Sequence, residues 1–225
     1  MIPDPALNIW EHSASLRKLC YRRALDLEPE MDCAAQAAEL VAPYLDRPAL
    51  KLLDVGCGGG HFYHCLVRRG LLADYYGLDY SPSLVRLAKA AFKKQGLDPQ
   101  KIILGDVRDL RDFACDIALV VNTLSFNPDF RAPLDRLSQT GCSVMVIRDN
   151  FGAKTLVRYE IDGFLDQGFN HLKGYWNCWS VSEVSNFLSD YSFKVKYFID
   201  RRTQGKVELV VGKPYHWSWL VAERK

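Results

Sequence analysis

The stretch "LLDVGCGGGHF", residues 52–62, places four glycines and a cysteine between a hydrophobic run and an aromatic residue. A glycine-rich turn directly after a strand lets the backbone approach a ligand that any Cβ would exclude. The helix that follows such a turn offers unpaired N–H groups to an anion. The stretch therefore predicts a ligand-binding loop between a first strand and a helix.

The spacing of the glycines does not match two common ligand loops. A dinucleotide fingerprint G-x-G-x-x-G that starts at Gly56 requires glycine at position 61, where the chain has His61. A phosphate-cradling P-loop requires G-K-[ST], which does not follow. The pattern is instead D-x-G-x-G-x-G, formed by Asp54, Gly56, Gly58 and Gly60.

Short apolar runs alternate with helix-like segments from residue 50 onward, which is typical of a parallel sheet covered by helices. The predicted strands are 50–56, 74–80, 101–107, 115–122 and 142–150. The helices predicted between them are 60–69, 81–95 and 128–137. Five successive β-α units indicate a doubly wound sheet.

The remaining segments predict additions to this core within a single domain, residues 1–225. Residues 1–46 are expected to form one or two amphipathic N-terminal helices separated by Pro29, and 50–150 the ligand-binding core. Residues 151–179 show no clean period and are predicted as an insertion. Residues 180–225 are expected to close the fold: Ser180 and Glu183 match a capping box that opens a helix, and two strands follow over 194–202 and 215–225.

Charge and cysteine usage narrow the function classes. The 29 Lys and Arg against 27 Asp and Glu leave a net charge of +2, with both signs spread along the chain, so no nucleic-acid partner is expected. The N-terminus has no apolar signal-peptide core and no stretch is long enough to span a bilayer, which predicts a soluble, cytoplasmic protein without a membrane partner. Seven scattered cysteines are interpreted as reduced thiols, with no metal site.

The D-x-G-x-G-x-G pattern resembles the first motif of class I S-adenosylmethionine (SAM)-dependent methyltransferases. Two acidic residues at later strand ends, Asp79 and Asp106, and the segment 122–126 after the fourth strand stand where this resemblance requires further motifs. The resemblance implies an α/β fold with a doubly wound, mostly parallel seven-stranded sheet and helices on both faces. It also implies an N-terminal helical cap and a substrate lid between strands five and six, here 151–179.

The resemblance further implies a role for each motif. Asp79 would accept hydrogen bonds from the ribose hydroxyls, Asp106 from the adenine amino group, and the Val107 N–H would contact an adenine ring nitrogen. The segment from Asn122 would line the methionine portion of SAM. The expected cofactor-binding residues are Asp54, Gly56, Cys57, Gly58, Gly60, Asp79, Tyr80, Asp106, Val107, Asn122 and Leu124. Either acidic residue could instead be a helix cap or a turn residue.

The sequence does not decide which side chains surround the methyl acceptor. His171, in the insertion, is a candidate general base, or an ordinary loop residue. His61 could face the carboxylate end of the cofactor or lie exposed at the helix start. The residues 148–150 could bind a polar substrate group or form an exposed turn. The aromatics of the insertion could wall an apolar pocket, face a cationic methyl acceptor or form the core of the insertion: Phe151, Tyr159, Phe164, Phe169, Tyr175, Trp176 and Trp179.

The function that the resemblance implies is methyl transfer by in-line displacement from SAM to an O or N atom of a small molecule. The N/D-P-P-Y/F tetrapeptide of the family's DNA- and glutamine-methylating branches is absent, and residues 122–125 are "NTLS". A protein-directed methyltransferase, a non-catalytic SAM-binding or regulatory protein and a nicotinamide-dependent oxidoreductase are the alternatives. Whether the chain forms a homodimer stays open.

Overall fold

The structure is a computed structural model that describes residues 9–225. Its centre is a sheet with the strand order β3-β2-β1-β4-β5-β12-β9, and a further short strand, β8, pairs with β5. The seven strands of this path are β1 (Leu50–Val55), β2 (Ala73–Asp79), β3 (Ile102–Leu104), β4 (Ile117–Val121), β5 (Val144–Gly152), β9 (Phe193–Ile199) and β12 (Trp217–Arg224). β1 to β5 pair in parallel, and β12 runs antiparallel to both β5 and β9. The predicted mostly parallel seven-stranded sheet is confirmed, with β8 as an extra strand.

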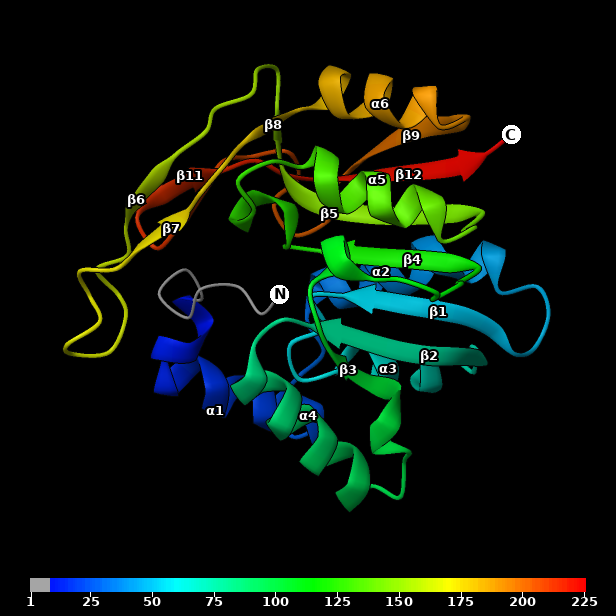
Figure 1. Cartoon of the computed structure of the whole chain (residues 1–225), viewed down its shortest axis with the longest axis horizontal. Helices are drawn as coiled ribbons and strands as arrows, with labels where there is room; N and C mark the ends of the chain where they lie inside the picture. The colour runs from blue at the N-terminus through cyan, green and yellow to red at the C-terminus, as the bar shows by residue number, and fades with distance from the viewer. Residues whose placement is uncertain (1–8) are drawn as a thin grey trace.

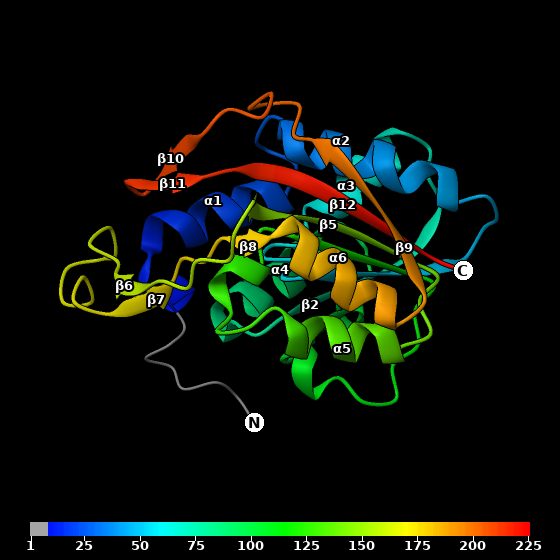
Figure 2. The same cartoon turned by 90° about the horizontal axis from the view of Figure 1, so that it is seen from above.

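Six α-helices accompany the sheet within residues 9–225 and cover both of its faces (Figure 2). They are α1 (Ala14–Ala24), α2 (Asp32–Val41), α3 (Phe62–Arg68), α4 (Pro82–Lys94), α5 (Arg131–Gln139) and α6 (Val181–Asp190). One hydrophobic cluster joins α2, α3 and α4 to one face of the sheet, and another joins α5 and α6 to the opposite face. Pro29 separates α1 from α2, as the sequence predicts.

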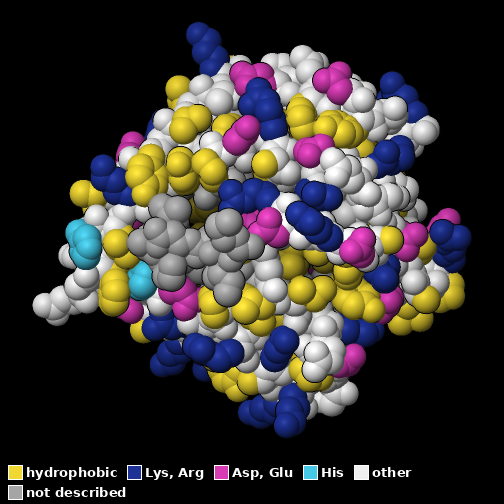
Figure 3. Space-filling view, viewed as in Figure 1, with side chains coloured by type: hydrophobic (Ala, Val, Ile, Leu, Met, Phe, Trp, Pro, Cys, Tyr) yellow, Lys and Arg dark blue, Asp and Glu magenta, His cyan; other side chains and the backbone are white. Residues whose placement is uncertain are grey.

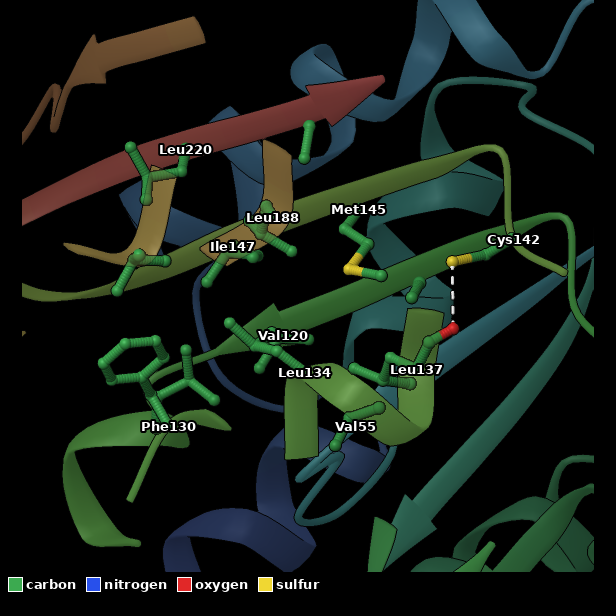
Figure 4. Packing of buried hydrophobic residues seen from close by; sticks show 14 of the residues in the cluster. Val55, Val120, Phe130, Leu134, Leu137, Cys142, Met145, Ile147, Leu188 and Leu220 are labelled. Atoms are coloured by element: carbon green, nitrogen blue, oxygen red, sulfur yellow. Dashed lines mark hydrogen bonds between the residues drawn. The ribbon is translucent and has the colours of Figure 1, made fainter. Parts of the chain in front are cut away.

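The central strand β4 is apolar along its whole length because side chains on both faces of the sheet are covered. In β4, Ala118 and Val120 face the α5 and α6 cluster, while Ile117 and Leu119 face the α2 and α3 cluster. Figure 4 shows the cluster that joins α5 and α6 to the sheet. In it the Cys142 thiol donates to the Leu137 carbonyl at 3.3 Å. None of the seven cysteines is in a disulfide bond.

Side-chain caps explain where two predicted helices begin. The Ser81 hydroxyl accepts from the Leu84 N–H at 3.2 Å and starts α4. The Ser180 hydroxyl accepts from the Glu183 N–H at 3.4 Å and starts α6. The Glu183 carboxylate bonds the Thr155 hydroxyl, so the capping box at this helix is present only in its serine half.

Two short ribbons lie outside the central sheet. In the insertion, β6 (Tyr159–Ile161) pairs with β7 (Lys173–Tyr175), and β8 (Trp179–Ser180) follows. A second ribbon, β10 (Glu208–Val210) with β11 (Lys213–Tyr215), stands between β9 and β12, where the sequence predicts no strand. Three-residue strands are too short to show a hydrophobic alternation, so their pattern is not visible in the sequence.

The carboxyl ends of the parallel strands meet at one edge of the sheet (Figure 1). The β6–β7 ribbon and the helix α1 lie on that side of the molecule. Charged side chains of both signs are interspersed over the face shown in Figure 3. Within the described residues, no helix is long and apolar enough to cross a membrane.

Candidate active site

A cavity of about 330 Å³ opens at the carboxyl ends of β1 to β4 and extends between α1, α2 and the glycine loop. Nine of the eleven residues that the sequence predicts for cofactor binding line it: Asp54, Gly56, Cys57, Gly58, Asp79, Tyr80, Asp106, Val107 and Asn122. These residues come from four different strand ends. The fold therefore brings the separate sequence motifs to one place.

Three predicted site residues lie elsewhere. Gly60 faces α4, where a Cβ would lie 2.9 Å from the Phe92 ring. Leu124 is fully buried in the α5 and α6 cluster. His171 is exposed on the insertion and does not line the cavity, whereas Tyr175 of the same insertion does.

The glycine loop is shaped by its protein neighbours as well as by the cavity. Gly56 has a φ of +72°, and a Cβ there would lie 2.3 Å from the Thr123 hydroxyl. A Cβ on Gly59 would lie 2.5 Å from the backbone oxygen of Cys20 in α1. Gly58, with a φ of +56°, faces the cavity, and a Cβ there would approach only the Cys20 sulfur, at 3.9 Å. Gly56 and Gly59 thus permit close packing, and Gly58 leaves room for a ligand.

Asp79 connects the ends of β1 and β2. Its carboxylate accepts from the Gly58 N–H at 2.8 Å and from the Ser81 N–H at 2.9 Å. Burial raises the pKa of Asp79 to about 6, although these backbone hydrogen bonds oppose the shift. The turn role considered from the sequence is therefore present, and the same side chain lines the cavity.

Asp54 is a second buried carboxyl group in the cavity wall. The Tyr75 hydroxyl donates to it at 2.6 Å. Burial raises the pKa of Asp54 to about 7, against the opposing effect of that hydrogen bond and with a contribution from the negative charge of Asp79. Part of the Asp54 population is therefore protonated at neutral pH.

Asp106 also has a structural partner. Its carboxylate accepts from the backbone N–H of Arg108 at 2.8 Å and from the Arg108 guanidinium at 2.9 Å. Arg108 and Val107 line the cavity beside it. The turn interpretation is again present at a residue that faces the cavity.

Arg23, on α1, is a cavity residue that the sequence does not reveal. Its Nε is buried and finds no partner among residues 9–225, and the same holds for Nδ1 of His61. Burial lowers the pKa of His61 to about 4, and the nearby charge of Arg23 adds to the shift. His61 is therefore neutral at pH 7, and the two side chains leave unsatisfied polar atoms at this end of the cavity. This placement favours the interpretation of His61 as a cavity residue over that of an exposed one.

An aromatic wall, formed by Trp10, Phe126 and Tyr175, bounds the cavity on the side of the insertion. Trp10 and Phe126 stack edge to face with ring centroids 4.9 Å apart. The other aromatics of the insertion have different places: Phe151, Trp176 and Trp179 are buried, and Tyr159, Phe164 and Phe169 are exposed. Only part of this aromatic set therefore faces the cavity.

The N-terminal 3-10 helix, Ile9–His12, holds this wall in place. The Glu11 carboxylate accepts from the Ser83 N–H at 2.9 Å and from the Ser81 hydroxyl, at the start of α4. The backbone of His12 accepts from the Asp166 N–H at 2.9 Å in the insertion. The segment before α1 thus connects the core to the insertion beside the cavity.

Arg148, Asp149 and Asn150 are buried within β5, so both interpretations of this segment, a substrate-binding group and an exposed turn, need correction. Arg148 forms an ion pair with Asp200 at 2.7 Å. The Asp149 carboxylate accepts from the backbone N–H groups of residues 123–125 at 2.9, 2.6 and 3.1 Å. The partners of these charges come from distant segments of the chain, which the sequence does not show, and Nη2 of Arg148 has no hydrogen-bond partner among residues 9–225.

Among the described residues, no group of three or more His, Cys, Asp or Glu side chains is arranged to hold a metal ion. The polar groups that face the cavity include carboxylates, amides and guanidinium groups. Such a set suits an organic ligand that bears hydroxyl, amino and carboxylate groups.

Comparison with known proteins relates the chain to methyltransferases. Residues 53–140 match the family model described as a methyltransferase domain. The described chain also has the fold of the magnesium protoporphyrin IX methyltransferase from Synechocystis PCC 6803, solved with bound S-adenosylhomocysteine (SAH). That superposition has a TM-score of 0.63 at 18% identity and covers 99% of this chain and 100% of the other. The segment 53–140 is therefore similar to methyltransferase domains, and the fold of the chain is that of solved SAM-dependent methyltransferases.

Two curated relatives share part of their length with this chain. The trans-aconitate 2-methyltransferase of Enterobacter sp. (strain 638) is 33% identical over 102 residues, 45% of this chain and 38% of the relative. The malonyl-[acyl-carrier protein] O-methyltransferase of Methylococcus capsulatus is 25% identical over 145 residues, 62% of this chain and 51% of the relative. The chain thus spans about half or less of the length of the curated relatives it matches.

Proposed function

We propose that the protein binds SAM in this cavity and transfers its methyl group to an O or N atom of a small molecule. The observation that carries the proposal is the convergence of the glycine loop, Asp79 and Asp106 on one cavity at the carboxyl ends of adjacent parallel strands. Open α/β sheets bind their ligands at this edge.

The polar groups of the cavity fit the functional groups of SAM. The Asp79 carboxylate suits the two ribose hydroxyls, and the Asp106 carboxylate and Val107 N–H suit the adenine edge. Arg23, whose Nε is buried without a partner within residues 9–225, suits the methionine carboxylate. The backbone at Gly58 leaves space for the methionine portion.

When bound, SAM would supply an electrophilic methyl group on a sulfonium sulfur. The residues of this chain then have to hold the acceptor in line with that methyl group and keep water out. The aromatic wall supplies an apolar surface for the second task. We propose that the insertion, 151–179, acts as a substrate lid, because its Tyr175 completes this wall.

The names of the two curated relatives support a small-molecule or carrier-bound acceptor over a nucleic acid. One is named for methylation of trans-aconitate, and the other for O-methylation of a malonyl group. The near-neutral charge of this chain agrees with that class of acceptor.

Isothermal titration with SAM, SAH and NADH tests the cofactor. We expect micromolar binding of both adenosyl ligands and no binding of NADH. Binding of NADH alone would overturn the proposal. Binding of SAM without turnover on any acceptor pool would instead favour a non-catalytic SAM-binding protein.

A further inference from the structure

Asn122, directly after β4, is held in one orientation by a buried ion pair. Nη1 of Arg148 donates to the Asn122 side-chain oxygen, and Nε of Arg148 donates to the Asp200 carboxylate at 2.7 Å. Because a guanidinium only donates hydrogen bonds, the amide oxygen of Asn122 must face Arg148. The Asn122 NH₂ group then points away from this oxygen.

The backbone of Asn122 adds to this constraint. Its φ is +55°, in the left-handed region that asparagine tolerates better than most residues. Its N–H donates to the Arg148 carbonyl at 2.8 Å, so Arg148 holds both ends of the residue. Asn122 lines the cavity, and its NH₂ group donates to no atom of residues 9–225. A fixed, unused donor therefore stands at the end of β4.

A fixed donor at this position selects between acceptor chemistries. An amine acceptor carries N–H groups and is best held by an oxygen, which here is engaged by Arg148. An acceptor with anionic oxygens presents lone pairs that an NH₂ group can bind. The orientation of Asn122 thus favours an oxygen acceptor over a nitrogen one.

The aromatic wall narrows the class of oxygen acceptor further. Among residues 9–225 it consists of Trp10, Phe126 and Tyr175, with Asn127 and Pro128 beside them, whereas the carboxyl and imidazole side chains of the cavity, Asp54, His61, Asp79 and Asp106, come from the glycine loop and the ends of β1 to β3. A phenol or alcohol usually needs a base to remove its proton, whereas a carboxylate is already ionised at neutral pH.

We infer that the acceptor is a carboxylate, bound through the Asn122 NH₂ group, with Arg148 as the residue that positions Asn122. This inference rests on the proposed methyltransferase function and specifies its acceptor. A carboxylate oxygen forms the new bond to the methyl carbon while the carbon–sulfur bond of SAM breaks. The electron pair of that bond stays on sulfur, so the products are SAH and a neutral methyl ester, and no proton moves.

The chemistry of the product tests the acceptor class. The full chain is incubated with methyl-tritiated SAM and three separate pools: di- and tricarboxylic acids including trans-aconitate, primary and secondary amines, and phenols. We expect label from the carboxylic acid pool only, released by alkali as volatile methanol, as methyl esters require. Alkali-stable label, label from another pool, or no label from the acids overturns the inference. A parallel SAH titration separates that failure from failure of the cofactor site.

Substitutions test the role of the NH₂ group. Asn122→Asp replaces the donor with an oxygen and should lower kcat/KM for the carboxylate by about 100-fold, as loss of one oriented donor does. SAH affinity is measured in the same variant, because Asn122 lines the cavity that is proposed to hold the cofactor. A loss of SAH affinity as large as the loss of kcat/KM would assign the NH₂ group to the cofactor and overturn the inference. Asn170→Asp, the same change at an exposed site of the insertion, is the matched control. An unchanged carboxylate rate in Asn122→Asp contradicts the inference.

Arg148→Lys tests the positioning role. Lysine presents one ammonium group and cannot hold Asp200 and Asn122 in the same fork geometry. We expect the KM for the carboxylate to rise by about tenfold, as loss of one charge-assisted contact predicts, with SAH affinity retained. An unchanged KM in the folded variant would show that Arg148 does not position Asn122. If this variant fails to fold, the Asn122→Asp result decides the acceptor class by itself.

Discussion

The Asp79 carboxylate accepts a hydrogen bond from the Gly58 N–H at 2.8 Å, across 21 residues of sequence. This bond joins the ends of β1 and β2 at the floor of the cavity. Because the carboxylate is buried, its pKa is raised to about 6, close to neutral pH. The proposed ribose contact is thus sensitive to pH in a way that an exposed aspartate would not be.

SAH affinity should therefore depend on pH. Below pH 6 Asp79 takes up a proton and can no longer accept from both ribose hydroxyls, so Kd should rise, approaching tenfold per pH unit. Titration calorimetry between pH 5 and 8 measures this. Asp79→Asn should bind weakly at every pH, and Asp54→Asn should keep the dependence. A flat profile in the native protein excludes the ribose role.

The free energy of unfolding should also depend on pH, through Asp54. Its folded pKa of about 7 lies above the ordinary aspartate pKa of 3.8, so the folded state holds more protons than the unfolded state between these values. The Asp54 contribution to stability is therefore present at low pH and is lost as pH rises through about 7. Urea denaturation at pH 5 and pH 8 should show a smaller fall in Asp54→Asn than in the native protein. An equal fall in both assigns the effect to other groups.

Arg23→Met should weaken SAH binding by about 1.5–3 kcal/mol, the range for a hydrogen bond to a charged group. The reason is that its Nε is buried without a partner within residues 9–225 beside the cavity. Binding of 5′-methylthioadenosine, which lacks the amino-acid portion, should not change. The control is Arg22→Met, on the exposed side of α1, where Arg22 pairs with Glu28. Equal losses for both ligands would place Arg23 away from the carboxylate.

Asp200→Ala should destabilise the fold by about 3–5 kcal/mol, because it leaves the buried Arg148 guanidinium without its counter-charge. Arg202→Ala, which breaks a solvent-exposed pair with Glu208, should cost about 1 kcal/mol or less. Urea denaturation of both variants gives the comparison. Similar values for the two would mean that Asp200 does not compensate Arg148.

Gly59→Ala should destabilise the fold by about 1–3 kcal/mol, the range for overpacking. The added Cβ would lie 2.5 Å from the Cys20 backbone oxygen and would displace α1 from the glycine loop. Gly163→Ala, where nothing lies within 4 Å of the added Cβ, should stay within about 0.5 kcal/mol of the native protein. Thermal unfolding measures both, and a neutral Gly59→Ala would show that α1 docks without this close contact.

Sequence patterns predicted the strands and the glycine loop because each depends on residues that are adjacent in the chain. Continuous apolar runs identify strands covered on both faces, and the glycine loop follows from the backbone freedom that it needs. The motifs at Asp79 and Asp106 also lie directly after strands, so the sheet topology brings them to one edge. By contrast, Leu124 and Gly60 are next to true cavity residues in sequence but face the protein interior. Which side chain of a loop faces a cavity depends on the packing of other segments.

The sequence by itself determined the doubly wound sheet, the order of its motifs and the carboxylates at its cavity, since each depends on residues close together in the chain. The tertiary structure decided the rest. Arg23 of α1 and Trp10 line the cavity, and His171 does not. Arg148 pairs with Asp200, 52 residues away in the chain. These contacts follow from how helices and ribbons dock on the sheet. Buried charges take their partners from whichever segments lie nearest in space, and the order of residues along the chain does not record that distance.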